Sequence, residues 1–263
     1  MAPEVDIVIR CKDGYELTEA CINSILANTE RQRVRIILSD DGSSDLQKHW
    51  DEVDIYVKHR KAHGAVTATN LGLQASLAFS DSEYVMVMDN DTRVPEGDVG
   101  WLDRFIAELE RYPDTGCVGA TTNYANPPQH ILSVPQTYTA DWSAEDGSGG
   151  VKDNPPSIWF ISFCCLLRKG VVRHLGLWDE QYNPGNFEDT DYAVRIREAG
   201  LQIRVARSVY IHHEGHKTFS TQLKSLLAEN RVKFIRKWGM GRLFDMGLIH
   251  PQEVSKVIRE LVQ

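Results

Sequence analysis

Short apolar runs alternate with helix-patterned segments through the first half of the chain, and this alternation constrains the fold more than any other feature. The apolar runs span residues 5–9, 34–38, 53–57, 84–88 and 117–120. Between them, apolar side chains recur at helical spacing over residues 15–28, 64–79 and 99–112. Because parallel strands need crossover connections, this order predicts an α/β fold with a mostly parallel central sheet and helices on both faces.

Two of the predicted strands end at paired carboxylates. Asp40 and Asp41 follow the second apolar run, and Asp89 and Asp91 follow the fourth. The carboxyl ends of parallel strands gather at one edge of a sheet, where ligands bind in open α/β folds. Two carboxylates separated by one residue can approach a hard divalent cation, which usually also binds phosphate oxygens. A solvated acidic turn is the alternative, because such triplets are common in loops.

The pattern changes after Asn123. Residues 123–156 are rich in proline and glycine, so we expect an irregular segment with a flexible loop at 141–156 over the crevice; a plain linker is the alternative. Beyond it, we predict ordered segments at 158–167 and 201–210, an amphipathic helix before Gly200, and a helical tail over 221–263.

A third acidic cluster opens that amphipathic helix, at Glu188, Asp189 and Asp191. Helix capping accounts for part of it, since acidic side chains suit a helix N-terminus. Crowded acids in one crevice repel one another unless a cation or a donor-rich ligand lies among them. A nucleoside diphosphate with a divalent metal supplies both. The chain has no Walker or Rossmann glycine motif, so basic side chains and the metal must neutralise the phosphates.

Composition excludes several other classes of protein. The 263 residues carry a net charge of −8, which argues against a broad basic nucleic-acid surface. Five cysteines without a C-x-x-C pair indicate neither a disulfide framework nor a zinc site. No apolar run is long enough for stable membrane insertion. We therefore expect a cytoplasmic location, with peripheral attachment to the inner face of the membrane as an alternative, through basic and apolar residues of the tail.

Several short motifs follow one another in a fixed order. They are S-D-D-G-S-S-D (39–45), R-K-A-H-G (60–64), M-D-N-D (88–91), F-E-D-T-D-Y (187–192), H-H-E-G-H (212–216) and R-K-W-G (236–239). Together they resemble the inverting family 2 glycosyltransferases, including rhamnosyltransferase-like polysaccharide glycosyltransferases, which have the fold called GT-A. The resemblance implies one GT-A domain with a Rossmann-like nucleotide-sugar-binding half (1–122), an acceptor-binding and catalytic half (123–220), and the helical tail (221–263).

The resemblance also assigns the nucleotide-binding residues. Asp40 and Asp41 are expected at the base, Arg60 and Asn70 beside the nucleotide, and Asp89 at the ribose; Asn90, the middle residue of the triplet, and Arg10 complete the set. The loop at Arg10 departs from the family's usual pattern, in which proline or asparagine is more frequent.

The metal and catalytic residues follow in the same way. Asp91 is expected to ligate Mn²⁺ or Mg²⁺, with His213 or its neighbour His212 close to the metal or the diphosphate. Asp189 is expected to be the general base, with Asp191 as its rival, and Glu188 to orient hydroxyl groups of the acceptor or donor.

The resemblance therefore implies a metal-dependent inverting glycosyltransferase. It would move a sugar from a nucleotide-sugar donor, a UDP-sugar or dTDP-sugar, to a hydroxyl of a glycan or glycolipid; a protein or a modified nucleic acid stays open as acceptor. The loop at 141–156 or at 212–219 would exclude water from the site. Trp159, Phe160 and Trp178 either stack on an acceptor sugar or belong to the core. The alternative function is a non-catalytic nucleotide-sugar-binding or nucleotidyl-handling protein.

Overall fold

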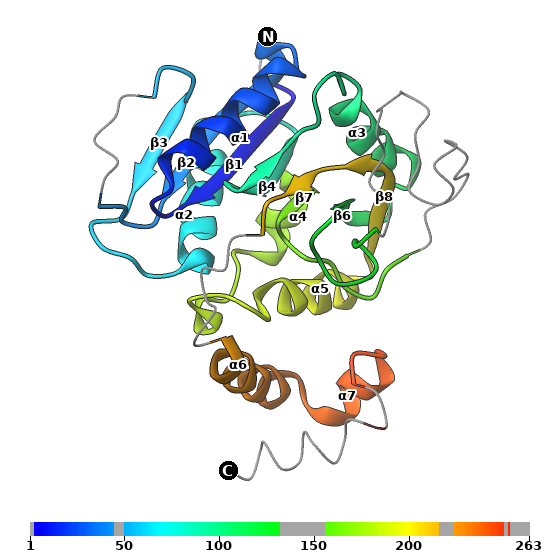
Figure 1. The fold of residues 1–263 in the computed structure, drawn as a ribbon. Coiled ribbons are helices and arrows are strands. Elements are labelled where there is room, and N and C mark those ends of the chain that lie inside the picture. Colours follow the sequence, from blue (N-terminus) through cyan, green and yellow to red (C-terminus); the bar gives the residue numbers. More distant parts are fainter. Residues whose placement is uncertain (1–2, 45–49, 132–155, 216–222, 250–251, 253–263) are drawn as a thin grey trace.

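A seven-stranded sheet forms the centre of the computed structural model, which describes residues 3–44, 50–131, 156–215, 223–249 and 252 (Figure 1). The strand order is β3-β2-β1-β4-β7-β6-β8. The strands are β1 (Val5–Cys11), β2 (Val34–Asp40), β3 (Ile55–Lys58), β4 (Tyr84–Asp89), β6 (Thr115–Thr121), β7 (Cys164–Arg168) and β8 (Gln202–Tyr210). All pairs are parallel except those of β7, which runs antiparallel to β4 and β6. The predicted α/β fold with a mostly parallel sheet is confirmed.

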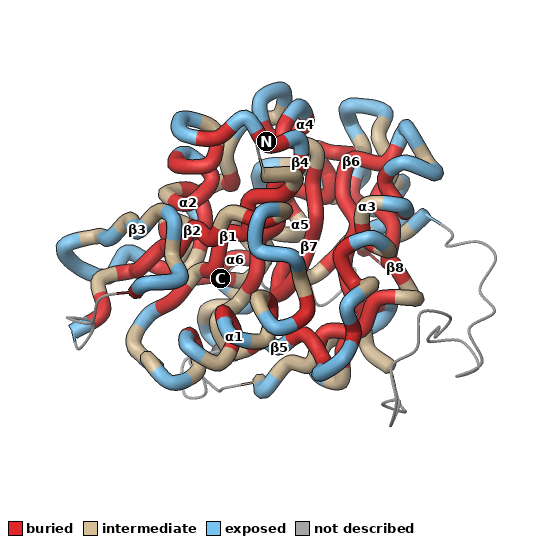
Figure 2. The backbone as a smooth tube through the Cα atoms, turned by 90° about the horizontal axis from the view of Figure 1, so that it is seen from above, coloured by how far each residue is buried: buried red, intermediate tan, exposed pale blue. Residues whose placement is uncertain are grey.

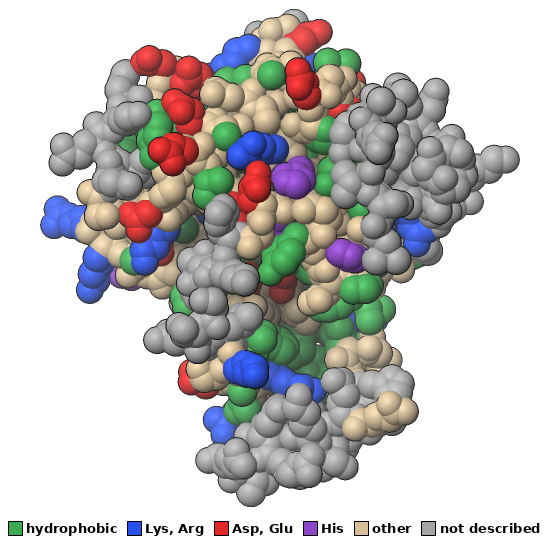
Figure 3. All heavy atoms as spheres, viewed as in Figure 1, with side chains coloured by type: hydrophobic (Ala, Val, Ile, Leu, Met, Phe, Trp, Pro, Cys, Tyr) green, Lys and Arg blue, Asp and Glu red, His purple; other side chains and the backbone are tan. Residues whose placement is uncertain are grey.

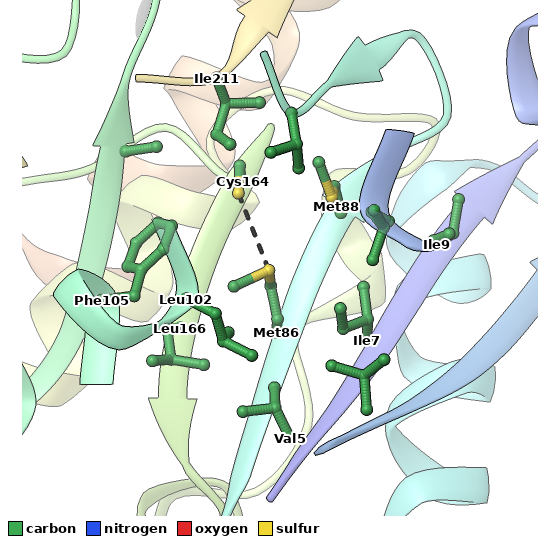
Figure 4. Packing of buried hydrophobic residues seen from close by; sticks show 14 of the residues in the cluster. Val5, Ile7, Ile9, Met86, Met88, Leu102, Phe105, Cys164, Leu166 and Ile211 are labelled. Atoms are coloured by element: carbon green, nitrogen blue, oxygen red, sulfur yellow. Dashed lines mark hydrogen bonds between the residues drawn. The ribbon is translucent and has the colours of Figure 1, made fainter. Parts of the chain in front are cut away.

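Helices cover both faces of this sheet, as predicted. They are α1 (Tyr15–Ala27), α2 (Ala65–Phe79), α3 (Trp101–Arg111), α4 (Lys169–Leu175) and α5 (Glu188–Glu198). Successive strand residues point to opposite faces, so Ile7 and Ile9 pack with α1 and α3, while Val8 packs with α2. Figure 4 shows the first of these clusters, with Met86 and Leu102 at its centre. The red tube of Figure 2 shows that the central strands are buried along their length.

One glycine explains the close contact between α2 and β1. A Cβ atom at Gly72 would lie 2.2 Å from a methyl carbon of Val8, so no larger side chain fits there without a shift. This contact fixes α2, and with it the loop that precedes it, against the carboxyl half of the sheet.

The structure differs from the sequence-based expectation beyond residue 156. The strand in the ordered segment predicted at 158–167 begins only at Cys164 and continues to Arg168, and α4 follows it directly. A small second sheet pairs β5 (Thr92–Arg93) with β9 (His212–His213), which sequence patterns did not predict because two-residue strands have no periodicity. Residues 141–155 and 216–219, in which closure over the site was expected, lie outside the described residues.

The tail contains α6 (Leu223–Trp238) and α7 (Met240–Asp245), separated at Gly239. Phe234 and Ile235 are buried against the domain, and Lys237 pairs with Asp179 at 2.8 Å. Part of the expected basic and apolar membrane face is therefore packed inward. Within the described ranges, no helix is both long and apolar enough to cross a membrane.

Candidate active site

A possible metal-binding group lies where β4 ends. The chain turns after Asp89 to reach Asp91, and pairing of β5 with β9 places His213 opposite Thr92. The Nε2 atom of His213 lies 3.2 Å from a carboxylate oxygen of Asp91. One ligand atom each from Asp89, Asp91 and His213 lies within 4.8 Å of the others. Two carboxylates and an imidazole form a ligand set that suits Mn²⁺ and accepts Mg²⁺.

The surroundings of His213 orient its ring for this role. Its Nδ1 atom is 3.1 Å from the carbonyl oxygen of Tyr124, and the ring stacks on Phe163. A carbonyl at Nδ1 fixes the proton there and leaves Nε2 able to bind a cation. Burial lowers the pKa of His213, but the hydrogen bond to Asp91 and the nearby carboxylate charges outweigh burial and raise it. His212 instead contacts Tyr210 and Glu214, so the structure brings His213 to Asp91.

Arg10 occupies the floor of the crevice. Its Nε atom donates to Asp89, one terminal nitrogen donates to Thr69 at 3.1 Å, and the other donates to the Ser162 hydroxyl at 3.1 Å. Burial alone would lower the pKa of Arg10, but Asp89 outweighs it and the guanidinium stays charged. One oxygen of Asp89 is thus engaged by Arg10, which leaves the other for a ligand. Asn90 turns away and donates to Thr18 at 2.9 Å.

Glu188 and Asp189 open α5 from the opposite side of the crevice. Phe187, the residue before them, has a φ of 74°, a left-handed conformation that is rare for an aromatic residue and is typical of functional sites. Asp189 accepts the Thr190 amide at 2.7 Å. Glu188 is buried, and its Oε2 atom has no hydrogen-bond partner among the residues that the structure describes.

The environment of these two carboxyls favours their protonated forms. Burial raises the pKa of Asp189. Burial, with the charge of Asp189, raises the pKa of Glu188 to about 8, and Arg10 opposes this shift. With its pKa raised to about 8, Glu188 can carry a proton at neutral pH and donate a hydrogen bond, and the raised pKa of Asp189 makes its carboxylate form a stronger base than an ordinary aspartate.

Replacement of Glu188 by glutamine should change how stability depends on pH. The folded-state pKa of Glu188 lies above its ordinary value near 4.5, so the unfolded chain loses this proton first as the pH rises. Wild-type stability should consequently fall between about pH 4.5 and pH 8 by up to about 1.4 kcal/mol per pH unit, and E188Q should lack this component. Urea unfolding at pH 5.5, 6.5 and 7.5 measures the difference. E198Q, at the other end of α5, should follow the wild-type slope, and equal slopes for wild type and E188Q would contradict the assignment.

A cavity of about 570 Å³ joins these groups, and we call it the central cavity. Its polar side is lined by Arg10, Asp89, Ser162, Glu188, Asp189 and His213. Figure 3 shows acidic and histidine side chains side by side on this face of the molecule. The metal-binding group and the predicted base thus face one space from different elements of the fold.

Other predicted nucleotide contacts lie outside the cavity lining. Asp41 accepts the amides of His63 and Gly64 at 2.7 and 2.8 Å, which holds the loop before α2. Asp40 is fully buried and accepts from Ser43 and Tyr56. Burial raises the pKa of Asp40, and these hydrogen bonds outweigh it, with a net lowering.

Asn70 and Arg60, also predicted beside the nucleotide, lie outside the cavity lining as well. The amide of Asn70 is buried and exchanges hydrogen bonds with the backbone of Trp178, at 2.8 and 2.9 Å. The side chain of Asn70 thus holds the turn before α5. Arg60 is exposed on the loop that Asp41 holds.

Asp191, the rival base, is enclosed by protein donors. Its carboxylate accepts from Trp238 at 2.8 Å and pairs with Lys237 at 2.7 Å. These two contacts connect α5 to α6. Asp191 is also fully buried, so an acceptor hydroxyl has no access to it in the described structure. Of the three aromatic residues considered for stacking, Phe160 and Trp178 are core residues and Trp159 lines the central cavity.

Comparison with known proteins identifies the family. Residues 6–176 match the model of "Glycosyl transferase family 2", and the chain belongs to this family. The chain is 26% identical, over 81% of its length, to the O-antigen biosynthesis protein RfbC of Myxococcus xanthus, of which it covers 17%. It is 23% identical, over 82% of its length, to an N-acetylglucosaminyl-diphospho-decaprenol L-rhamnosyltransferase of Mycobacterium tuberculosis, of which it covers 78%.

A solved structure shows the same fold. Over 90% of the chain, the structure resembles GalNAc-T7, crystallised with UDP, GalNAc and Mn²⁺, with a TM-score of 0.68 and 15% identity. That match covers 48% of the GalNAc-T7 chain, so this chain spans less than half of it. The GT-A fold expected from the sequence motifs is confirmed.

Proposed function

We propose that this chain is a metal-dependent inverting glycosyltransferase that moves a sugar from a UDP-sugar or dTDP-sugar to an acceptor hydroxyl. One observation carries the proposal: Asp89 and His213, which form a possible metal-binding group with Asp91, line the same central cavity as Glu188 and Asp189. A protein that only bound the nucleotide would need the first group but not a basic carboxylate opposite it. Family membership supports the transfer reaction over the non-catalytic alternative.

The residues divide the reaction between them. When bound at Asp91 and His213, Mn²⁺ or Mg²⁺ offsets the negative charge that develops on the leaving diphosphate. Asp189 takes the proton of the acceptor hydroxyl as that oxygen attacks the anomeric carbon, and this single displacement inverts the configuration. Glu188, protonated at neutral pH, donates a hydrogen bond that orients a hydroxyl of the acceptor or donor. Asp89 holds the ribose with the oxygen that Arg10 leaves available.

The nucleotide base is assigned to the region of Asp41 and the loop at 59–64. In this proposal the base approaches Asp41 where the amides of His63 and Gly64 now bind, so this loop must adjust when the nucleotide enters. Residues 1–122 then supply the donor half and residues 123–220 the acceptor half. The names of the two curated relatives support a glycan or glycolipid acceptor.

A thermal-shift screen of nucleotides with Mn²⁺ tests the donor class. At a ligand concentration about 100 times the dissociation constant, binding stabilises the folded state by about 2.7 kcal/mol. This corresponds to a rise in melting temperature of roughly 5 °C or more for a chain of this size. UDP or dTDP should produce the rise with Mn²⁺ and a smaller one without it, while ADP serves as the control. A rise with ADP as large as that with UDP and dTDP, or no rise with either UDP or dTDP beyond that of Mn²⁺ alone, would contradict the proposal.

A further inference from the structure

The wall of the central cavity opposite the metal-binding group is apolar. Leu227 and Phe234 come from α6, Leu248 and Ile249 follow α7, Phe187 precedes α5, and Trp159 precedes β7. Phe187 and Phe234 pack together with their ring centroids 5.4 Å apart. Figure 3 shows hydrophobic side chains gathered in the hollow between the body of the domain and α6. The wall begins at Phe187, next to Glu188 and Asp189, so a molecule that reaches Asp189 also reaches this wall.

Two large apolar side chains at this cavity remain exposed to solvent. Leu227 on α6 is 38% exposed, and Ile158 on the facing segment is 41% exposed. Exposed apolar side chains that line the same cavity mark a binding surface for an apolar ligand. A free oligosaccharide would fit poorly here, because sugar hydroxyls placed against this wall would lose water without gaining hydrogen-bond partners.

One basic residue adjoins the apolar wall. Arg231 lies four residues after Leu227 on α6, on the same helical face, and lines the cavity with it. The neutral polar members of the lining are Asn126, Ser162, Asn186 and Thr190. A ligand that matches this arrangement has an anionic group next to a hydrocarbon chain.

We propose that this wall binds the lipid part of the acceptor, a sugar joined through an anionic group to a hydrocarbon chain. The accepting hydroxyl lies at Asp189, the anionic group lies near Arg231, and the chain runs along Phe234, Leu248 and Leu227. This inference rests on the proposed function, because it places the acceptor relative to Asp189. It gives the helical tail a part in acceptor binding and makes the acceptor a glycolipid.

Binding of alkyl phosphates tests the inference without knowledge of the acceptor sugar. The probes are butyl, hexyl, octyl and decyl phosphate, titrated below their critical micelle concentrations by calorimetry against the full chain. Metal-free buffer keeps the phosphate from binding a cation at Asp91. Affinity should rise about threefold to fourfold for each added methylene until the wall is covered. L227S should lower the affinity for decyl phosphate roughly tenfold and that for butyl phosphate much less, and R231Q should weaken all four probes by a similar factor.

The control variant is F244S on α7, where the phenylalanine is exposed but does not line the cavity. It should bind every probe like the wild type. If L227S does not fold, I158S on the facing segment replaces it. Affinity that is independent of chain length would show that the wall is covered by the chain itself or by a second copy, and would overturn the inference. Equal losses of decyl phosphate affinity in F244S and L227S would also overturn the inference.

The test separates this inference from the proposed function. Nucleotide binding with Mn²⁺, followed by thermal shift, should be the same in L227S and wild type. Normal nucleotide binding together with chain-length-independent probe binding refutes the lipid site alone. Absent nucleotide binding together with normal probe binding refutes the donor assignment alone.

Discussion

Substitution of Asp189 by asparagine should reduce sugar transfer by about 10²–10⁴-fold, the usual contribution of a general base. Asparagine keeps the size of the side chain and can still accept the Thr190 amide, but it cannot take a proton. Because Asp189 does not belong to the metal-binding group, the affinity for the nucleotide should be nearly unchanged. The rate of transfer under saturating donor, with parallel calorimetry of nucleotide binding, measures both quantities.

The matched control for D189N is E198Q, at the last residue of the same helix. It removes a carboxylate charge from α5 at a position far along the helix from the cavity, and transfer should continue at the wild-type rate. Transfer by D189N at more than about a tenth of the wild-type rate would show that another group accepts the proton. Asp191, the rival base, is fully buried, and Trp238 and Lys237 contact its Oδ1 atom.

Removal of the metal, or replacement of Asp91, should reduce sugar transfer at least as much as D189N does. A cation on the leaving diphosphate contributes several kcal/mol to the transition state, so chelation should slow the reaction by more than about 10²-fold. Mn²⁺ or Mg²⁺ should restore the wild type. D91A should not be restored at the same concentration, because it lacks the carboxylate assigned to the metal and leaves His213 without its carboxylate partner. Initial rates across a titration of each cation measure this.

D81N is the matched control, because Asp81 is an exposed acid near the start of β4, the strand that ends at Asp89. Its requirement for the cation should equal that of the wild type. Full activity in chelator would remove the role assigned to Asp91. Recovery of D91A at the wild-type cation concentration would place the metal elsewhere.

Much of this site follows from local sequence. The apolar run before Asp89 has the length and composition of a buried strand, and acidic residues at its end belong at the ligand-binding edge of a parallel sheet. The position of Arg10 beside Asp89 also follows from the predicted parallel sheet. Parallel pairing of Val5 with Tyr84 sets Arg10 beside Asp89, since both lie five residues further along their strands.

Long-range contacts explain what local sequence patterns alone could not show, including the choice of His213 over His212, which the family resemblance had left open. The approach of His213 to Asp91 depends on the pairing of two strands with two residues each, which leaves no periodic signal. Asn70 donates a hydrogen bond to the carbonyl oxygen of Trp178, 108 residues away in the sequence, and no local sequence pattern indicates this partner. Asp191 looks equivalent to Asp189 in the sequence, and only the arrival of Lys237 and Trp238 from α6 separates their environments.

Calorimetry of Mn²⁺-dependent nucleotide binding to the wild type, D91A and D189N tests the division between metal site and base most directly. The account predicts that D189N binds the nucleotide with the affinity of the wild type. It predicts that D91A binds at least about tenfold more weakly and no longer responds to Mn²⁺. Loss of Mn²⁺-dependent affinity in D189N, or its retention in D91A, would contradict the account.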